Sequence, residues 1–433
     1  MKVSDKKVTK NFLWIMIGKI LQSILGLIIN RLTAEYLGTS NYGVINYAMT
    51  LFTFVFPLAQ LGLSVVIIQD VVENKDEDGE ILGSAIFSSL ISSAICYIGV
   101  LAFVAIINCG EIDVLLCCLA YGVTLFAQAL YLITYWYQAK LLSKYLSILS
   151  IIAYLTTTLY KVFLLINQAE VWLFALSYSI DYGVIAVIGI IIFKQKSRKA
   201  LTISKVRCLQ LLNKSKYFII PNIMLTILGQ TDKLMLKWMM GNEEIGLYTA
   251  AYNCAGVLAF VFVAIIDSFR PAILESNKTD SGLFAENMKS LYSVLIYLSA
   301  AVCVGYTICS KLIIFILYGS AYVSASNVLK VTVWHTIFTY IGPARDTWIL
   351  AKGRQAVLWK INLAGAIINV ILNIIFIHFW GIIGAAWASV ISQVCVYIIL
   401  GLMVPSIREC TVLMFKSVNP RYFLGFCKGI VKG

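Results

Sequence analysis

The feature that most constrains this chain is a series of apolar stretches, each long enough to cross a lipid bilayer as a helix. A spanning α-helix needs about 20 predominantly apolar residues, because each residue advances it by about 1.5 Å across a hydrocarbon layer about 30 Å thick. Twelve such stretches occur along the sequence. They occupy residues 12–30, 42–68, 81–108, 114–137, 145–166, 171–193, 217–240, 245–268, 291–318, 327–350, 361–380 and 382–404.

The composition and the character of these stretches favour an all-α membrane protein. Of the 433 residues, 60% are hydrophobic and 13% are charged, whereas an average soluble domain has about 25% charged residues. Backbone polar groups within hydrocarbon must be paired inside the structure, and these stretches are too long and too uniformly apolar for the strands of a barrel. The first stretch is followed by Arg31 and Glu35 instead of a small-residue cleavage site, so we interpret it as a span and not as a signal peptide.

The placement of the basic residues, which give the chain a net charge of +13, indicates a membrane topology and not a nucleic-acid surface. With the N-terminus placed in the cytoplasm, the cytoplasmic segments hold 26 of the 34 Lys and Arg residues. The external connections hold only Arg31, and the remaining seven lie within the spans. This is the positive-inside pattern, so we expect a multi-pass protein with both termini cytoplasmic and no nucleic-acid partner. Contact with anionic lipid head groups is a secondary expectation.

The longest polar stretch, residues 194–216, lies close to the middle of the chain. We therefore predict an N-terminal lobe of six spans at 1–193, a cytoplasmic basic linker at 194–216, and a C-terminal lobe of six spans at 217–404. A cytoplasmic tail, 405–433, follows.

Two pairs of glycines support a duplication of the six-span lobe. Gly38 and Gly43 recur as Gly241 and Gly246 at the same spacing, each pair after the first span of its lobe. Glycine suits an external turn because it accepts positive φ. Both lobes then run in the same direction, which predicts a relation by an axis along the membrane normal.

The sequence contains none of the common catalytic or metal-binding motifs that we considered. It has no GxxxxGK[ST] phosphate loop and no HExxH, and its two histidines, His335 and His378, are far apart. We interpret both histidines as packing or interfacial residues. The chain is therefore expected to be no enzyme, with no catalytic residues, no metal and no cofactor.

Ionisable residues within the spans are the strongest candidates for function, because a charge inside a bilayer is costly unless it faces a cavity or a partner. For Lys19, Asp181, Asp232 and Lys233 we favour a cavity over structural pairing. Charges nearer the span ends also have a simpler interpretation, in which the side chain reaches the interface. These are Arg31, Lys161 and Lys237 at the external ends, and Asp267, Arg270, Arg345 and Asp346 toward the cytoplasm.

Four passages, in order and running nearly end to end, resemble the flippases that move polysaccharide repeat units in O-antigen and capsule synthesis. These belong to the multidrug/oligosaccharidyl-lipid/polysaccharide exporter superfamily. The passages are RLTAEYLGTSNYGVINYA (31–48), YWYQAKLLSKYLSI (135–148), TDKLMLKWMMGNEEIGLYTAAYN (231–253) and NVILNIIFIHFWGIIGAAWASVIS (369–392). The chain departs from the family pattern at Ala139, where many relatives have Gly, and at His378–Phe379, where Pro is frequent.

The resemblance implies two six-helix lobes around a central cavity that work by alternating access in a bacterial cytoplasmic (inner) membrane. The implied substrate is an oligosaccharide repeat unit on polyprenyl pyrophosphate. Membrane lipids, the polysaccharide polymerase and the chain-length machinery are the implied partners. With no ATP site, transport would draw on an ion gradient, on removal of product outside, or on both.

The in-span charges take roles in this scheme. We expect Lys19, Arg31 and Lys233 to form the main site for the pyrophosphate, with Arg270 and Arg345 as a second tier on the cytoplasmic side. Asp181 and Asp232 are the candidates for ion coupling, by protonation or by binding a cation. Two alternatives stay open: a drug/cation antiporter of the same superfamily, which favours a cavity dominated by carboxylates, and a membrane glycan polymerase, which favours a large external loop.

Overall fold

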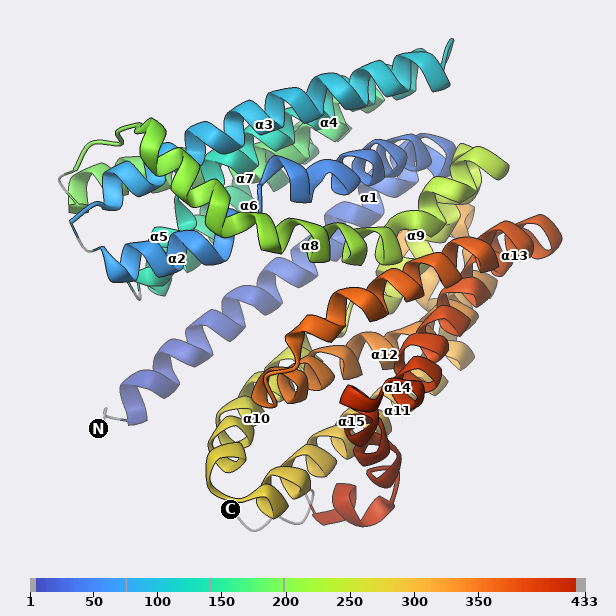
Figure 1. The fold of residues 1–433 in the computed structure, drawn as a ribbon. Helices are drawn as coiled ribbons and strands as arrows, with labels where there is room; N and C mark the ends of the chain where they lie inside the picture. Colours follow the sequence, from blue (N-terminus) through green and yellow to red (C-terminus); the bar gives the residue numbers. More distant parts are fainter. Residues whose placement is uncertain (1–4, 75, 141, 198, 426–433) are drawn as a thin grey trace. The chain divides into compact units, whose positions relative to one another are not determined.

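The computed structural model describes residues 5–74, 76–140, 142–197 and 199–425; it does not describe the side chains of residues 5–24, 143, 271, 272, 278, 279 and 356. Within these residues the chain is built from helices and contains no strand, as Figure 1 shows. The predicted all-α membrane fold is confirmed.

The helices follow one another with short connections, most of them a few residues long. In the first half of the chain they are α1 (Asp5–Ala59), α2 (Leu63–Glu73), α3 (Asp78–Ile107), α4 (Ile112–Tyr131), α5 (Thr134–Ala139), α6 (Ser143–Ile166), α7 (Val171–Ser197) and α8 (Lys205–Met239). The second half contains α9 (Asn242–Gly256), α10 (Ala259–Thr279), α11 (Ser281–Tyr318), α12 (Ala325–Ala351), α13 (Leu358–Val394), a π-helical turn (Cys395–Ile399), α14 (Leu400–Met403) and α15 (Pro405–Lys416). Two short 3₁₀ turns, Ser320–Tyr322 and Gln355–Val357, flank α12.

Eight helical segments among the described residues are long and apolar enough to cross a membrane. Helices α1 and α13 each hold parts of two predicted spans, which a glycine separates: Gly38 in α1 (φ +70°) and Gly381 in α13 (φ +57°). Helices α8 and α12 coincide with two further predicted spans and carry more charged residues. Each of the twelve predicted stretches thus corresponds to a helix, to half of a broken helix, or to a pair of consecutive helices.

The predicted glycine turns are only half right. Gly38 and Gly241 do occupy positive φ, at +70° and +134°, where a side chain would be strained. Gly43 and Gly246 instead lie inside helices α1 and α9, and both are buried. The second glycine of each pair therefore serves packing and not the turn.

The chain divides into two compact units, Met1–Thr226 (unit 1) and Ile227–Gly433 (unit 2), and the boundary falls inside α8. In unit 1 helix α4 packs most extensively on α7, and α6 packs on α7 and α1. In unit 2 helix α12 is central and contacts α9, α11 and α13. The amphipathic α15 covers α11 and α12 and contributes Ile407, Cys410 and Leu413 to the apolar core.

The basic segment 194–216 is largely ordered within unit 1. It contains the end of α7, a short extended stretch and the first turns of α8. The extended stretch lies directly on α3, where a Cβ added to Gly79 or to Gly83 would come within 2.2 Å of a backbone carbonyl oxygen. Only glycine at these positions lets the two backbones approach so closely.

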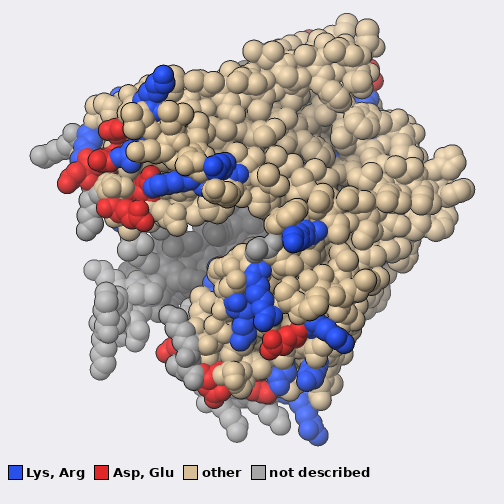
Figure 2. Space-filling view, in the orientation of Figure 1, with Lys and Arg blue, Asp and Glu red and all other residues tan. Residues whose placement is uncertain are grey.

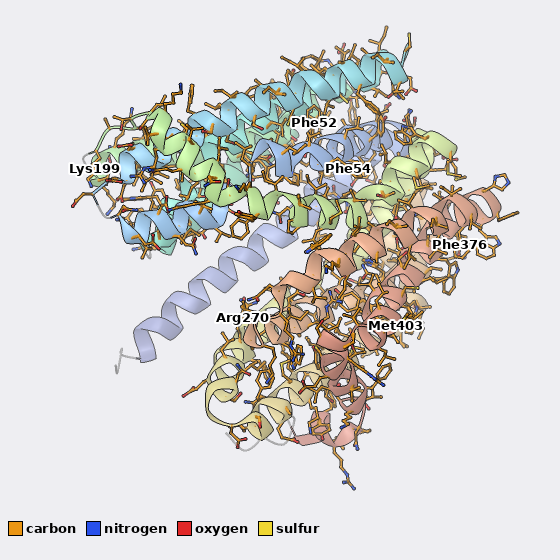
Figure 3. The ribbon with its side chains drawn as sticks, viewed as in Figure 1. Phe52, Phe54, Lys199, Arg270, Phe376 and Met403 are labelled. Atoms are coloured by element: carbon orange, nitrogen blue, oxygen red, sulfur yellow. The ribbon has the colours of Figure 1, made fainter. Side chains whose placement is uncertain are left out.

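Ion pairs hold the same end of unit 1 together. Asp70, 1% exposed, lies 2.6 Å from Lys214 Nζ, and Arg207 pairs with Glu77 and Glu80. Asp78 is also buried, and accepts hydrogen bonds from Trp136 Nε1 at 2.9 Å and from Lys140 Nζ at 3.2 Å. Figure 2 shows charged side chains gathered over this end of unit 1, whose position Lys199 marks in Figure 3.

We predict that Asp78→Ala lowers the free energy of unfolding by about 1–3 kcal/mol, because the indole N–H of Trp136 stays buried without an acceptor. Thermal unfolding of the purified protein in detergent measures the effect. The control is Asp76→Ala, since the Asp76 side chain is fully exposed and pairs with Lys199 only at the surface. Equal melting temperatures for the two variants would contradict the assigned role of Asp78.

Candidate functional site

A buried polar site of unit 2 is built around Asp232 on α8. This side chain is 4% exposed, although it lies within a predicted span. Its Oδ1 accepts a hydrogen bond from Asn373 Nδ2 at 2.7 Å, and its Oδ2 accepts one from the Tyr248 hydroxyl at 2.7 Å and another from the Ser389 hydroxyl. Three donors from two other helices therefore converge on one carboxylate.

Helix α13 supplies much of this site because Gly381 divides it into two halves that both face Asp232. Asn369 and Asn373 lie four residues apart in the first half, which places them on one face of the helix. The Asn373 amide also donates to the backbone and side-chain oxygens of Asn369, at 2.9 and 3.0 Å. Ser389 comes from the second half.

A cavity of about 10 Å³ lies beside the carboxylate. That volume is close to the minimum that one water molecule requires. It is lined by Leu228, Gly229, Asp232, Tyr252, His335, Asn369, Ser389, Ser392 and Gln393. On its far side His335 Nε2 lies 3.0 Å from Gln393 Nε2, and His335 Nδ1 lies 3.3 Å from the Thr339 hydroxyl.

Two oxygens of the same cluster lack donors. Asn373 Oδ1 and Gln393 Oε1 are buried, and neither has a hydrogen-bond partner among the described side chains and backbone. A buried acceptor without a donor is costly. With the Asp232 carboxylate they make this cluster rich in oxygen acceptors, which is the kind of site that accepts a proton or a hard cation.

Lys233 follows Asp232 directly but points elsewhere. It is 8% exposed, and its Nζ lies 5.0 Å from the centre of the Tyr252 ring on α9. Adjacent residues on a helix face different directions, so the ammonium group contacts an aromatic face while the carboxylate contacts α13. Lys233 makes no ion pair within the described part of the chain.

Arg345 is the second predicted cation that the structure buries. It is 6% exposed on α12, and its guanidinium lies 4.1 Å from the Tyr397 ring, which the π-helical turn carries. Its Nε and Nη1 are buried and have no hydrogen-bond acceptor among the described residues, and the nearest carboxylate oxygen, of Asp346, is 3.8 Å from Nε.

The other predicted cations are placed differently. Arg31 is partly exposed and pairs with Glu35 at 3.1 Å, and Arg270 on α10 (Figure 3) is exposed and pairs with Asp267 at 3.2 Å. Both pairs are local, between neighbouring turns of one helix. The side chain of Lys19 lies outside the described residues, so its predicted position stays a prediction.

Asp181 belongs to unit 1 and is only partly buried on α7. It lies close enough to Lys161 of α6 for the two charges to attract each other. The Nζ of Lys161 lies 4.9 Å from the centre of the Tyr178 ring on α7. The predicted coupling residues Asp181 and Asp232 therefore occupy separate sites in separate units.

Sequence reasoning missed several members of the Asp232 site. His335 was interpreted as a packing or interfacial residue, yet it lines the cavity. Ser389 and Tyr248 carry no signal of their own, because serine and tyrosine are common in apolar helices. The pair Asn369 and Asn373 was the one available signal, through its family resemblance and its spacing of four residues.

Comparison with known proteins places this architecture in a family. A model described as "Polysaccharide biosynthesis protein" matches residues 8–276, which is more than half of the chain. The chain belongs to this polysaccharide biosynthesis family. The resemblance expected from the four sequence passages is confirmed, and the chain is a multi-pass membrane protein of a polysaccharide biosynthesis family.

Two curated archaeal relatives match part of the chain. One, an uncharacterized membrane protein of Methanocaldococcus jannaschii, is 24% identical over 51% of this chain and 46% of its own length. Another, a probable low-salt glycan biosynthesis flippase of Haloferax volcanii, is 23% identical over 42% of this chain and 39% of its own length. The matches thus span less than half the length of these relatives.

Solved structures share the whole fold. The lipid II flippase MurJ, in an inward closed conformation, superimposes with a TM-score of 0.74 over 96% of this chain and 93% of its own, at 15% identity. An inward-facing multidrug resistance transporter of the MATE family gives 0.69 over 91% and 96%, at 12% identity. At such identities the similarity establishes the fold of the exporter superfamily.

Proposed function

We propose that this chain is a flippase that moves polyprenyl-pyrophosphate-linked oligosaccharide repeat units across the cytoplasmic membrane by alternating access, for O-antigen or capsule synthesis. The main support is the family match over residues 8–276 in a chain with the fold of a lipid II flippase. The termini are proposed to be cytoplasmic on the distribution of Lys and Arg. The lobes 1–193 and 217–404, joined by 194–216, remain part of the proposal, as do a polymerase and chain-length partners.

The Asp232 site supports the coupling role in this proposal. Its carboxylate, its unpartnered amide oxygens and its water-sized cavity together form a place for a proton or a small cation inside unit 2. Asp181 remains the second coupling candidate, with Lys161 as its electrostatic partner. Binding of an ion at either position would bias the equilibrium between conformations only if its affinity differs between them.

The structure also suggests which of the five proposed recognition residues are most available to bind a phosphate. Lys233 and Arg345 are buried without a hydrogen-bonded acid in the described chain, so a phosphate would add a partner to each. Arg31 and Arg270 already pair with carboxylates and would have to exchange them for phosphate. Lys19 stays among the proposed recognition residues because it lies within the first predicted span.

We predict that deletion of the gene leaves lipid-linked repeat units on the inner leaflet and abolishes surface polysaccharide. Analysis of extracted lipid-linked glycans and of the cell surface measures both. Normal surface polysaccharide with increased sensitivity to cationic drugs would instead favour the antiporter, whose fold the chain shares.

For coupling, we predict that Asp232→Asn reduces transport at least about tenfold, which corresponds to about 1.4 kcal/mol, because the variant can neither take up a proton nor attract a cation. The amount of folded protein in the membrane should stay normal, since the amide keeps the size of the carboxyl group. Asp181→Asn tests the second candidate in the same assay. Wild-type transport by both variants would rule out ion coupling through these residues.

For recognition, we predict that Lys19→Glu and Lys233→Glu abolish surface polysaccharide at normal expression, because a charge acts on phosphate far more strongly in a low-dielectric site than in water. Lys19→Arg and Lys233→Arg, which keep the charge, are the matched controls and should retain much of the activity. If Lys19→Gln and Lys233→Gln both transport as well as the wild type, recognition does not depend on these cations.

A further inference from the structure

Unit 1 contains a polar face, here named the tyrosine wall, that includes the coupling candidate Asp181 and its partner Lys161 together with four tyrosines that no proposed role has explained. It consists of Tyr131 on α4, Tyr154 and Lys161 on α6, and Tyr178, Asp181 and Tyr182 on α7. On α7 Asp181 and Tyr182 follow Tyr178 by three and four residues, so Tyr178 is a neighbour of both, and on α6 the two residues are seven apart and lie on one face.

Contacts within the face join Tyr131 to Tyr182 and Lys161 to Tyr178. The Tyr131 and Tyr182 rings meet edge to face with centroids 5.4 Å apart, and Lys161 Nζ lies 4.9 Å from the Tyr178 ring centre. Beneath them the buried Tyr121 packs against Tyr178, with ring centroids 5.4 Å apart. The rings are therefore supported from below.

The tyrosine wall does not behave as a lipid-facing surface. Its six side chains lie within the spans and are only partly buried, and two of them carry charge. A charge is costly against hydrocarbon and tolerable against water. The lipid-facing positions on the same helices are apolar and much more exposed, for example Leu159 at 69% and Val187 at 54%. The tyrosine wall is therefore best explained as the side of an aqueous recess.

The chemistry of the wall selects one class of ligand. Tyrosine offers a flat apolar face and a hydroxyl that both donates and accepts hydrogen bonds. Lys161 and Asp181 carry opposite charges and offset each other, so the surface attracts neither a phosphate nor a cationic drug strongly. A neutral ring with apolar C–H faces and many hydroxyl groups, which is a sugar, complements all of these features.

We propose that the tyrosine wall binds the sugar rings of the lipid-linked glycan, which rests on the proposed flippase function. In this arrangement the tyrosine wall contacts the saccharide, while the cations proposed above for recognition serve the phosphate. Tyr182 and Tyr178 provide stacking faces, and Lys161 and Asp181 hydrogen-bond to sugar hydroxyl groups.

The test uses thiol labelling of the full chain in a background without its 11 native cysteines, first shown to support surface polysaccharide. Tyr182→Cys is compared with Val187→Cys on the same helix. An impermeant charged thiol reagent is applied to opened membrane vesicles from cells that make the lipid-linked glycan and from cells blocked at its first sugar transfer. Farnesyl diphosphate, which carries an isoprenoid and an anion but no sugar, is added to the second sample in a further arm.

We expect the thiol at position 182 to react in vesicles without glycan, and to react at least about tenfold more slowly when the glycan is present, while position 187 stays unreactive in both. Farnesyl diphosphate should give no protection. An unreactive position 182 would show that the wall does not face water, equal rates would show that no glycan binds there, and protection by farnesyl diphosphate would assign the wall to the lipid carrier.

A second measurement applies if the Tyr182→Cys variant fails to insert into the membrane. It also separates this proposal from the proposed flippase function. Tyr182→Phe, which keeps the ring, should lose less surface polysaccharide than Tyr182→Leu, which loses about tenfold at equal expression. Equal activity of the two variants would contradict the proposal that the tyrosine wall binds sugar rings. Normal surface polysaccharide in the deletion strain would overturn the flippase function itself, whatever the labelling shows.

Discussion

Hydrocarbon offers no hydrogen-bond partner, and almost everything in this structure follows from that constraint. Backbone groups are satisfied within helices. Each polar side chain inside a span must find a partner or face water, because burying it unpaired costs free energy. The two breaks in regular helix, at Gly38 and Gly381, occur where glycine can take positive φ. The break at Gly381 lets two halves of one helix surround the same carboxylate, so a local backbone property creates a buried polar site of unit 2.

The two units meet this constraint in different ways. In unit 2 the polar side chains turn toward one another: Asp232 has three donors, and the adjoining cavity is no larger than one water molecule. In unit 1 the polar side chains of the tyrosine wall remain partly exposed and are supported by rings beneath them. A closed cluster suits a proton or a small ion, whereas an open aromatic face suits a larger neutral group.

The sequence predicted the spans well because a bilayer imposes one length and one polarity on every helix. It also singled out Asp232 and Lys233, which the structure buries, since a charge in an apolar run stands out, whereas the burial of Arg345 was not predicted. The partners of Asp232 were harder to predict. Asn373 and Ser389 are 141 and 157 residues away along the chain, and their residue types are ordinary in membrane helices. The contact of Lys161 with Tyr178 was also not predictable, because it depends on how α6 packs against α7.

A transporter of large polar molecules must hold its substrate firmly enough to select it and loosely enough to release it. A single deep cationic pocket would bind pyrophosphate tightly and slow release, because attraction in a low-dielectric site is strong. The proposed division of recognition avoids this: the proposed cations would attract the anion, and the offset charges and rings of the tyrosine wall would contribute shape without net charge. The proposed coupling at Asp232 would then need to supply only the difference in affinity between conformations, since an ion that binds both equally shifts nothing.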